Sequence, residues 1–169
     1  MIRMTIQSVL VSGGPLTSLV ILKTKAPYKG GSVVQLPIRI GSVEAHGISL
    51  SAEGITLDRP ITQDLLADVI TQLGAEVTAV SIVSVEEKTF FARLELKRAD
   101  GTRCLLDARP SDALALALRC DAPIFAEESV LDAASMPDFR QVEDSEKLHK
   151  IEEFHDFVES LSPDDFTQV

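Results

Sequence analysis

The chain has 169 residues, of which 45% are hydrophobic, and this is enough for one domain around a single core. No apolar run reaches the roughly 18 residues of a membrane-spanning helix, and the first residues lack the apolar core and cleavage site of a signal peptide. The net charge of −10 means that contact with nucleic acid would require a local basic patch.

The negative charge is concentrated near the C-terminus. Residues 1–139 hold 13 Lys and Arg against 17 Asp and Glu, whereas residues 140–169 hold 3 against 9. The composition also becomes polar from Pro137 onward. We therefore predict a folded domain over residues 1–136, followed by an acidic linker and a helical tail over residues 137–169.

The two cysteines, Cys104 and Cys120, both lie in apolar runs without a nearby metal-ligand motif. This placement is typical of buried thiols in a reducing compartment, so we expect a cytoplasmic protein.

The N-terminal part predicts three strands and a helix. Alternating hydrophobicity indicates strands over residues 4–11, 17–23 and 32–40, with a hairpin turn at Gly13-Gly14-Pro15. Pro37 lies inside the third strand, which indicates an edge position or a bulge. Residues 41–53 are predicted to form a helix that packs through small residues.

The most regular helical pattern follows the sequence Arg59-Pro60-Ile61-Thr62. Thr62 is the predicted N-cap, Asp64 suits the first turn, and Gly74 ends the helix. The apolar side chains recur at intervals of three and four along one face of this helix; they are Leu66, Val69, Ile70 and Leu73. Asp64 falls away from that face, so we interpret it as a solvated charge.

Residues 76–108 predict a three-stranded meander with a hairpin turn at Asp100-Gly101. The last strand delivers Asp107 to a second Arg-Pro turn, where Pro110 keeps Arg109 extended. Ser111 is the predicted N-cap of a short helix over residues 112–120. A brief strand over residues 123–126 and a helix over residues 127–134 follow.

Residues 145–161 predict an amphipathic helix, which is too short for an independent coiled coil. Its apolar residues are Leu148, Ile151, Phe154, Val158 and Leu161. The whole pattern predicts an α+β fold: a mostly antiparallel or mixed β-sheet with packed helices, plus this C-terminal amphipathic helix.

Familiar catalytic motifs are missing from the sequence: it has no Gly-rich phosphate loop, no Gly-x-Ser-x-Gly elbow, no His-Glu-x-x-His and no Cys-x-x-Cys. Charged residues at the predicted helix starts and turns remain. Clustered carboxylates can hold Mg²⁺ or Mn²⁺ for phosphodiester hydrolysis, while arginines neutralise the phosphate. The same residues are also typical of helix caps and Asp–Arg pairs.

Three segments of the chain resemble the bifunctional nuclease domain family. They are Leu36-Pro37-Ile38-Arg39-Ile40-Gly41-Ser42-Val43-Glu44-Ala45, Arg59-Pro60-Ile61-Thr62-Gln63-Asp64-Leu65-Leu66 and Asp107-Ala108-Arg109-Pro110-Ser111-Asp112-Ala113. The resemblance covers about residues 4–136, and the segment Ser162-Pro163-Asp164-Asp165-Phe166 resembles the C-terminal extension of actinobacterial members. It implies an α+β domain, activity on both DNA and RNA, and convergence of the three segments in space.

Carried over by position, the resemblance implies a site drawn from the charged residues of the three segments: Glu44, His46, Arg59, Asp64, Asp107, Arg109 and Asp112. The first hypothesis is a metal-assisted phosphodiesterase. Asp107 with Glu44 or Asp112 would hold Mg²⁺ or Mn²⁺, and no organic cofactor is expected. Arg109 or Arg59 would contact the phosphate, and His46 is the candidate general base.

The second hypothesis is a non-catalytic binding or regulatory module. In that case the Arg-Pro turns are structural, and the tail helix mediates oligomerisation or docks on a partner. Under either hypothesis we expect a homo-oligomer that does not associate with membranes.

Overall fold

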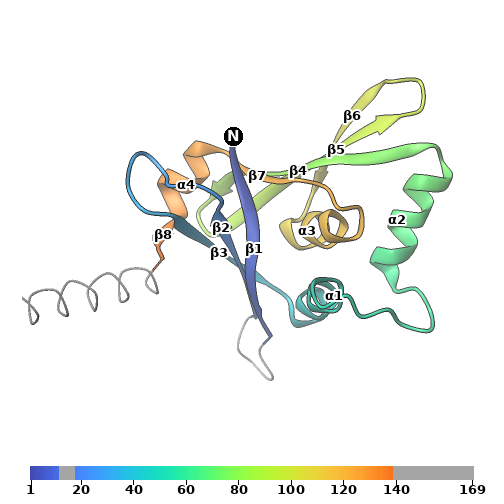
Figure 1. The fold of residues 1–169 in the computed structure, drawn as a ribbon, viewed down its shortest axis with the longest axis horizontal. Helices are drawn as coiled ribbons and strands as arrows, with labels where there is room; N and C mark the ends of the chain where they lie inside the picture. The colour runs from blue at the N-terminus through green and yellow to red at the C-terminus, as the bar shows by residue number, and fades with distance from the viewer. Residues whose placement is uncertain (12–17, 139–169) are drawn as a thin grey trace, which may run out of the picture. The chain divides into compact units, whose positions relative to one another are not determined.

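The computed structural model describes residues 1–11 and 18–138, and Figure 1 shows how their helices and strands are arranged. Within these residues, eight strands form one mixed sheet in the order β6-β5-β4-β7-β1-β2-β3-β8. The predicted α+β fold is confirmed. The strands are β1 (Ile2–Leu10), β2 (Ser18–Thr24), β3 (Val34–Ile40), β4 (Ala75–Glu86), β5 (Thr89–Arg98), β6 (Arg103–Ala108), β7 (Ile124–Ala126) and β8 (Met136–Pro137).

Strands β1, β2 and β3 form the first antiparallel half of the sheet, as predicted. The turn predicted at residues 13–15 lies outside the described residues. Pro37 stands opposite Ile21 in a regular register without a bulge. It is tolerated because β3 is followed in the sheet only by the two-residue β8, so most of its outer edge needs no ladder hydrogen bonds.

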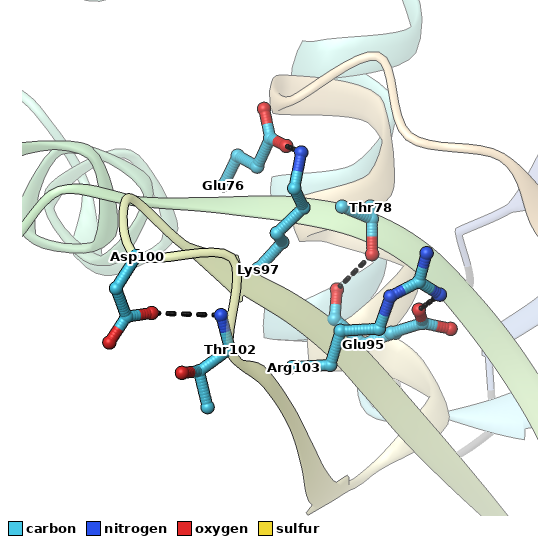
Figure 2. A network of polar contacts seen from close by, with 7 residues as sticks. All are labelled: Glu76, Thr78, Glu95, Lys97, Asp100, Thr102 and Arg103. Atoms are coloured by element: carbon cyan, nitrogen blue, oxygen red, sulfur yellow. Dashed lines mark hydrogen bonds and ion pairs between the residues drawn. The ribbon is translucent and has the colours of Figure 1, made fainter.

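Strands β4, β5 and β6 form the predicted meander. At the β5–β6 turn, Gly101 has a φ of 84°, and the Asp100 carboxylate accepts a hydrogen bond from the Thr102 amide at 2.8 Å (Figure 2). Strand β7 joins the two halves, because it pairs parallel to β4 and antiparallel to β1. A three-residue strand carries too little pattern to reveal such pairing from the sequence.

One face of the sheet carries the core. The fully buried pairs Val20–Ile38 and Leu22–Leu36 stand opposite each other on β2 and β3. On β4 and β5, the fully buried residues Ile82 and Ala92 also stand opposite each other. Helices α1 (Ser42–Ala52), α3 (Pro110–Arg119) and α4 (Glu128–Ala134) contact strands of this sheet.

Helix α3 lies deepest in the core, with every residue from Ala113 to Ala117 buried. Burying a leucine such as Leu114 or Leu116 contributes roughly 1.5–3 kcal/mol.

Two predicted helix caps are wrong by one or two positions. Helix α2 (Thr62–Gln72) has Ile61 rather than Thr62 at its N-cap, and helix α3 has Arg109 rather than Ser111. Proline at the first helical position explains α3, because its fixed φ suits the helix and its missing N–H would be unpaired there anyway. Arg109 is extended, with φ −68° and ψ 144°, as predicted.

The apolar face predicted for α2 is only partly covered. Ile70 packs against the core, but Leu66 is 42% exposed and Leu73 is 79% exposed. The helix and its apolar face are therefore present, but most of that face is exposed in the described part of the chain.

Residues Met1–Met136 form one compact unit. Both cysteines within it are half-buried free thiols, and burial raises the pKa of the Cys120 thiol. None of the helices within the described ranges is long and apolar enough to cross a membrane. The helix predicted over residues 145–161 lies outside the described residues.

Candidate functional site

The first turns of α1 and α3 are joined by one arginine. Arg109 donates from Nη1 to Glu44 Oε1 at 3.0 Å. It also donates from Nε and Nη2 to the two oxygens of Asp112, at 2.7 and 3.0 Å. The first and third family-like segments therefore meet in space, with Arg109 paired bidentately to one carboxylate and singly to the other.

The local sequence explains this geometry. Pro110 keeps Arg109 extended at the N-cap of α3, and Asp112 lies in the first turn, where a carboxylate suits the positive end of the helix dipole. Glu44 likewise lies in the first turn of its helix, α1. Its carboxylate folds back over Gly41, so a Cβ at position 41 would collide with Glu44 Oε2.

The electrostatics keep Arg109 charged. Asp112, and to a lesser extent Glu44, raise the pKa of the Arg109 guanidinium above its already high value. The Arg109 side chain is 65% exposed, whereas that of Glu44 is 22% exposed. The cation is therefore accessible to an anionic ligand, with one of its carboxylates largely covered.

A cavity of about 280 Å³ opens beside this ion-pair cluster. It is lined by the end of β3, the β4–β5 turn, and the first residues of α1 and α3. Three cations, Arg39, Lys88 and Arg109, line it together with Glu44. Its size is at the lower end of small-molecule pockets, and its three cations suit an anionic group such as a phosphate.

Three of the predicted site residues lie elsewhere. Asp107 is exposed on β6, opposite Arg93 of β5, because strand alternation turns it away from the half-buried Ala108. His46 is exposed on α1, with Nδ1 3.3 Å from the Ser42 carbonyl oxygen, and Arg59 is exposed in the α1–α2 loop. None of the three lines the cavity.

The second family-like segment forms a separate junction between helices. Asp64 Oδ1 accepts a hydrogen bond from Arg119 Nε at 2.5 Å, and Asp64 Oδ2 accepts one from the Ile61 amide at 2.9 Å. Arg119 is only 9% exposed and also donates to the carbonyl oxygens of Ala115 and Gly47. The segment thus ties α2 to α1 and α3.

Charge pairing at this junction lowers the pKa of Asp64, chiefly through the hydrogen bond from Arg119 and then through the Ile61 amide. The interpretation of Asp64 as a solvated charge was wrong, because its partner Arg119 lies 55 residues away in the chain.

The predicted metal ligands are only partly brought together. In the described part of the chain, no three His, Cys, Asp or Glu side chains are placed so that they could hold a metal ion. Glu44 and Asp112 face the same guanidinium, while Asp107 lies on β6. The three-carboxylate set of Glu44, Asp107 and Asp112 therefore does not fit a metal centre in this conformation.

Two cavity residues, Arg39 and Lys88, were missed from the sequence. Arg39 belongs to the first family-like segment, and Lys88 lies in the predicted turn between two strands. The distribution of charge along the sequence could have indicated a basic surface here. The segments that form β7, β1, β2 and β3 contain no acidic residue, although the chain as a whole is acidic.

The basic residues of these neighbouring strands share the face of the sheet that lies opposite the core. Lys23 of β2 pairs with Thr5 of β1, which is two residues from Arg3 and on the same face. Arg39 of β3 pairs with Leu19 of β2. Arg3 also lies over the Phe125 ring, 5.2 Å from its centroid. This surface is a local basic patch of the kind that contact with a polyanion requires.

Comparisons with known proteins identify sequences that are related to this chain. Residues 20–138 match the family model described as the bifunctional nuclease domain. The "Uncharacterized protein Rv1829" of Mycobacterium tuberculosis is 42% identical over 135 residues, which cover 78% of this chain and 80% of that protein. The "Bifunctional nuclease 2" of Arabidopsis thaliana is 29% identical over 135 residues, or 79% of this chain and 39% of that protein.

The family model spans most of the chain and both segments that meet at Arg109. The chain belongs to the bifunctional nuclease domain family.

Proposed function

We propose that the chain hydrolyses phosphodiester bonds of DNA and RNA at the cluster of Glu44, Arg109 and Asp112. The observation that carries this proposal is the accessible Arg109, which joins the starts of two helices beside a small cavity lined by two further cations. Family membership supports the same activity.

In this proposal Arg109 binds the non-bridging oxygens of the scissile phosphate, and Arg39 and Lys88 contact the same or a neighbouring phosphate. The N-termini of α1 and α3 add partial positive charge to the same region. Phosphoryl transfer is accelerated mainly by positioning and by electrostatic stabilisation of this kind.

Glu44 is the proposed general base. When Arg109 turns toward a phosphate, it releases the Glu44 carboxylate, which then accepts a proton from the attacking water while the bond to the leaving oxygen breaks. Solvent supplies the proton to the leaving oxygen. This role replaces His46, which is exposed and does not line the cavity.

Dependence on Mg²⁺ or Mn²⁺ stays a prediction. When bound, either cation would supply Lewis acidity to the phosphate, but the two carboxylates that meet are both paired with Arg109.

The test is hydrolysis of single- and double-stranded DNA and RNA by the purified full chain, with Mg²⁺, with Mn²⁺ and with EDTA. Arg109→Ala should lower the rate by roughly 10²–10³-fold, because it removes a charged group aimed at the phosphate. Arg98→Ala removes an exposed arginine of β5 that does not line the cavity, and it should leave the rate unchanged.

Substitutions at Asp107, His46 and Arg59 test the remaining predicted roles. If Asp107→Asn abolishes hydrolysis while Arg109→Ala does not, the cluster is the wrong site. If the wild-type chain is inactive with every metal, the proposed hydrolysis is wrong.

The alternative is a non-catalytic binding or regulatory module, and one observation favours it. The charge on Arg109 is already shared by two carboxylates, as in a structural ion-pair network. Equilibrium binding of nucleic acid that weakens in Arg109→Ala, without any turnover by the wild type, would support this alternative.

A further inference from the structure

Strand β6 lies at one end of the sheet, and among the described residues no strand pairs with its outer edge (Figure 1). Leu105 is 58% exposed and Leu106 is 43% exposed. The register of β6 with β5 is continuous, without a bulge. Natural proteins usually protect such edges with proline, bulges or repelling charges, and β6 has charges of opposite sign at Arg103 and Asp107.

The phase of the hydrogen bonds shows which residues face this open edge. Arg98 donates to the Thr102 carbonyl oxygen at 2.9 Å, which identifies a hydrogen-bonded pair at the start of the β5–β6 ladder. Because such pairs alternate along antiparallel strands, the backbone groups of Arg103, Leu105 and Asp107 point away from β5.

A side-chain contact agrees with this phase. Thr78 Oγ1 on β4 donates to the Glu95 carbonyl oxygen at 3.1 Å (Figure 2). That carbonyl therefore faces β4 and not Leu105, its neighbour on β6.

We propose that β6 pairs antiparallel with β6 of a second copy of this chain across a twofold axis. Leu105 then stands opposite Leu105 of the partner subunit, and Arg103 stands opposite Asp107 of the partner subunit. All three outward-facing residues exchange main-chain hydrogen bonds in this register. The contact is self-complementary, as a twofold interface requires.

Charge selects this register over its neighbours. A shift by two residues places Arg103 opposite Leu105 of the partner subunit or beyond the strand. A shift by four in one direction places Arg103 opposite its own copy, and in the other direction Asp107 opposite its own copy. Like charges directly opposite each other destabilise a strand pair, so the proposed register is favoured.

The charges on the adjacent strand extend the same pattern. Arg103 already contacts Glu95 of β5 at 2.6 Å (Figure 2), and Asp107 stands opposite Arg93. In the paired sheet Asp107 would therefore lie between Arg93 and Arg103 of the partner subunit. Arg103 stands opposite Lys97 in the β5–β6 register, but it contacts the diagonal Glu95 carboxylate and would gain Asp107 of the partner subunit on its other side. The exposed apolar side chains of α2, such as Leu73, lie near this end of the sheet, because the Gly74 carbonyl accepts a hydrogen bond from Ala99 at 2.8 Å.

Disulfide cross-linking tests the register in the full chain, with Cys104→Ser and Cys120→Ser as the background. Leu105→Cys should form a covalent dimer on oxidation, because Cα atoms of a hydrogen-bonded antiparallel pair lie about 5.5 Å apart, within disulfide reach. Arg103→Cys and Asp107→Cys should each remain monomeric in gels when alone. A mixture of these two variants should form the covalent dimer.

Sedimentation of the full chain tests the charge pairs. Arg103→Asp should weaken dimerisation roughly tenfold or more, because it creates two pairs of facing negative charges across the interface of each dimer. Arg98→Asp makes the same charge change on β5, away from the interface, and should leave dimerisation unchanged.

A monomer at every concentration, or a dimer that neither cross-links through Leu105→Cys nor responds to Arg103→Asp, would overturn the proposal. The latter result would locate the interface elsewhere. Neither result bears on hydrolysis at Arg109, which is measured separately.

Discussion

Arg109 shows how a local rule and a distant contact combine at one residue. Its extended backbone follows from Pro110 and could be predicted from the sequence. Its bond to Glu44 joins residues 65 positions apart, which no spacing along the chain reveals. The sequence therefore identified Arg109 as a candidate, and the fold supplied its partners.

Gly41 is expected to control the position of Glu44. Gly41→Ala should displace the Glu44 carboxylate from Arg109, because the added Cβ occupies its place. The backbone at position 41 is extended, with φ −70°, so alanine introduces no backbone strain. A crystal structure of the variant should show the displaced carboxylate, and hydrolysis should fall roughly tenfold to a hundredfold.

Gly31→Ala is the matched control, since its added Cβ makes only an ordinary contact, 3.5 Å from the Tyr28 carbonyl oxygen. Retention of the Glu44–Arg109 bond in Gly41→Ala would contradict the first expectation. Unchanged hydrolysis despite the displaced carboxylate would argue against Glu44 as the general base.

At the scale of elements, the helix starts and the helix junctions obey different rules. The starts of α2 and α3 were predicted within one or two residues, because proline and first-turn carboxylates act locally. The junction of α1, α2 and α3 through Arg119 was not predicted, because its contacts span helices that are distant in the sequence.

The Asp64–Arg119 pair should make the stability of this junction depend on pH. The folded-state pKa of Asp64 lies below its ordinary value, so its stabilising effect is complete above about pH 5 and is lost as the pH falls through the folded pKa. Asp64→Asn should lower the free energy of unfolding by about 1–2 kcal/mol at neutral pH, because it leaves Arg119 without its carboxylate.

Denaturant unfolding between pH 2 and pH 7 checks this expectation, and the difference from wild type should shrink on acidification. Asp68→Asn, an exposed position of the same helix, is the control. A difference that is constant with pH would show that the ion pair is not its source.

At the scale of the molecule, charge is distributed unevenly over an acidic chain. The acid-free strands β7, β1, β2 and β3 lie next to each other in the sheet, although β7 comes from a distant part of the sequence. Their basic side chains therefore gather on one face. The negative net charge is therefore not spread evenly over the surface of the molecule.

Pairing through β6 should also make thermal stability depend on protein concentration. Binding to the folded state stabilises it by mass action, so the Tm of the full chain should rise with concentration. Leu105→Lys places two like charges on the twofold axis and should abolish the dependence. A wild-type Tm that does not change over a hundredfold concentration range would contradict a dimer of folded chains.

By itself, the sequence determined the fold class, the strands of both antiparallel halves and the two Arg-Pro helix starts, because hydrophobic period, turn residues and proline act over a few residues. Only the tertiary structure decided that Glu44, Arg109 and Asp112 meet while Asp107, His46 and Arg59 lie apart. The physical reason is that strand alternation, helix rotation and the insertion of β7 set the direction of each side chain, and these depend on pairing between distant segments.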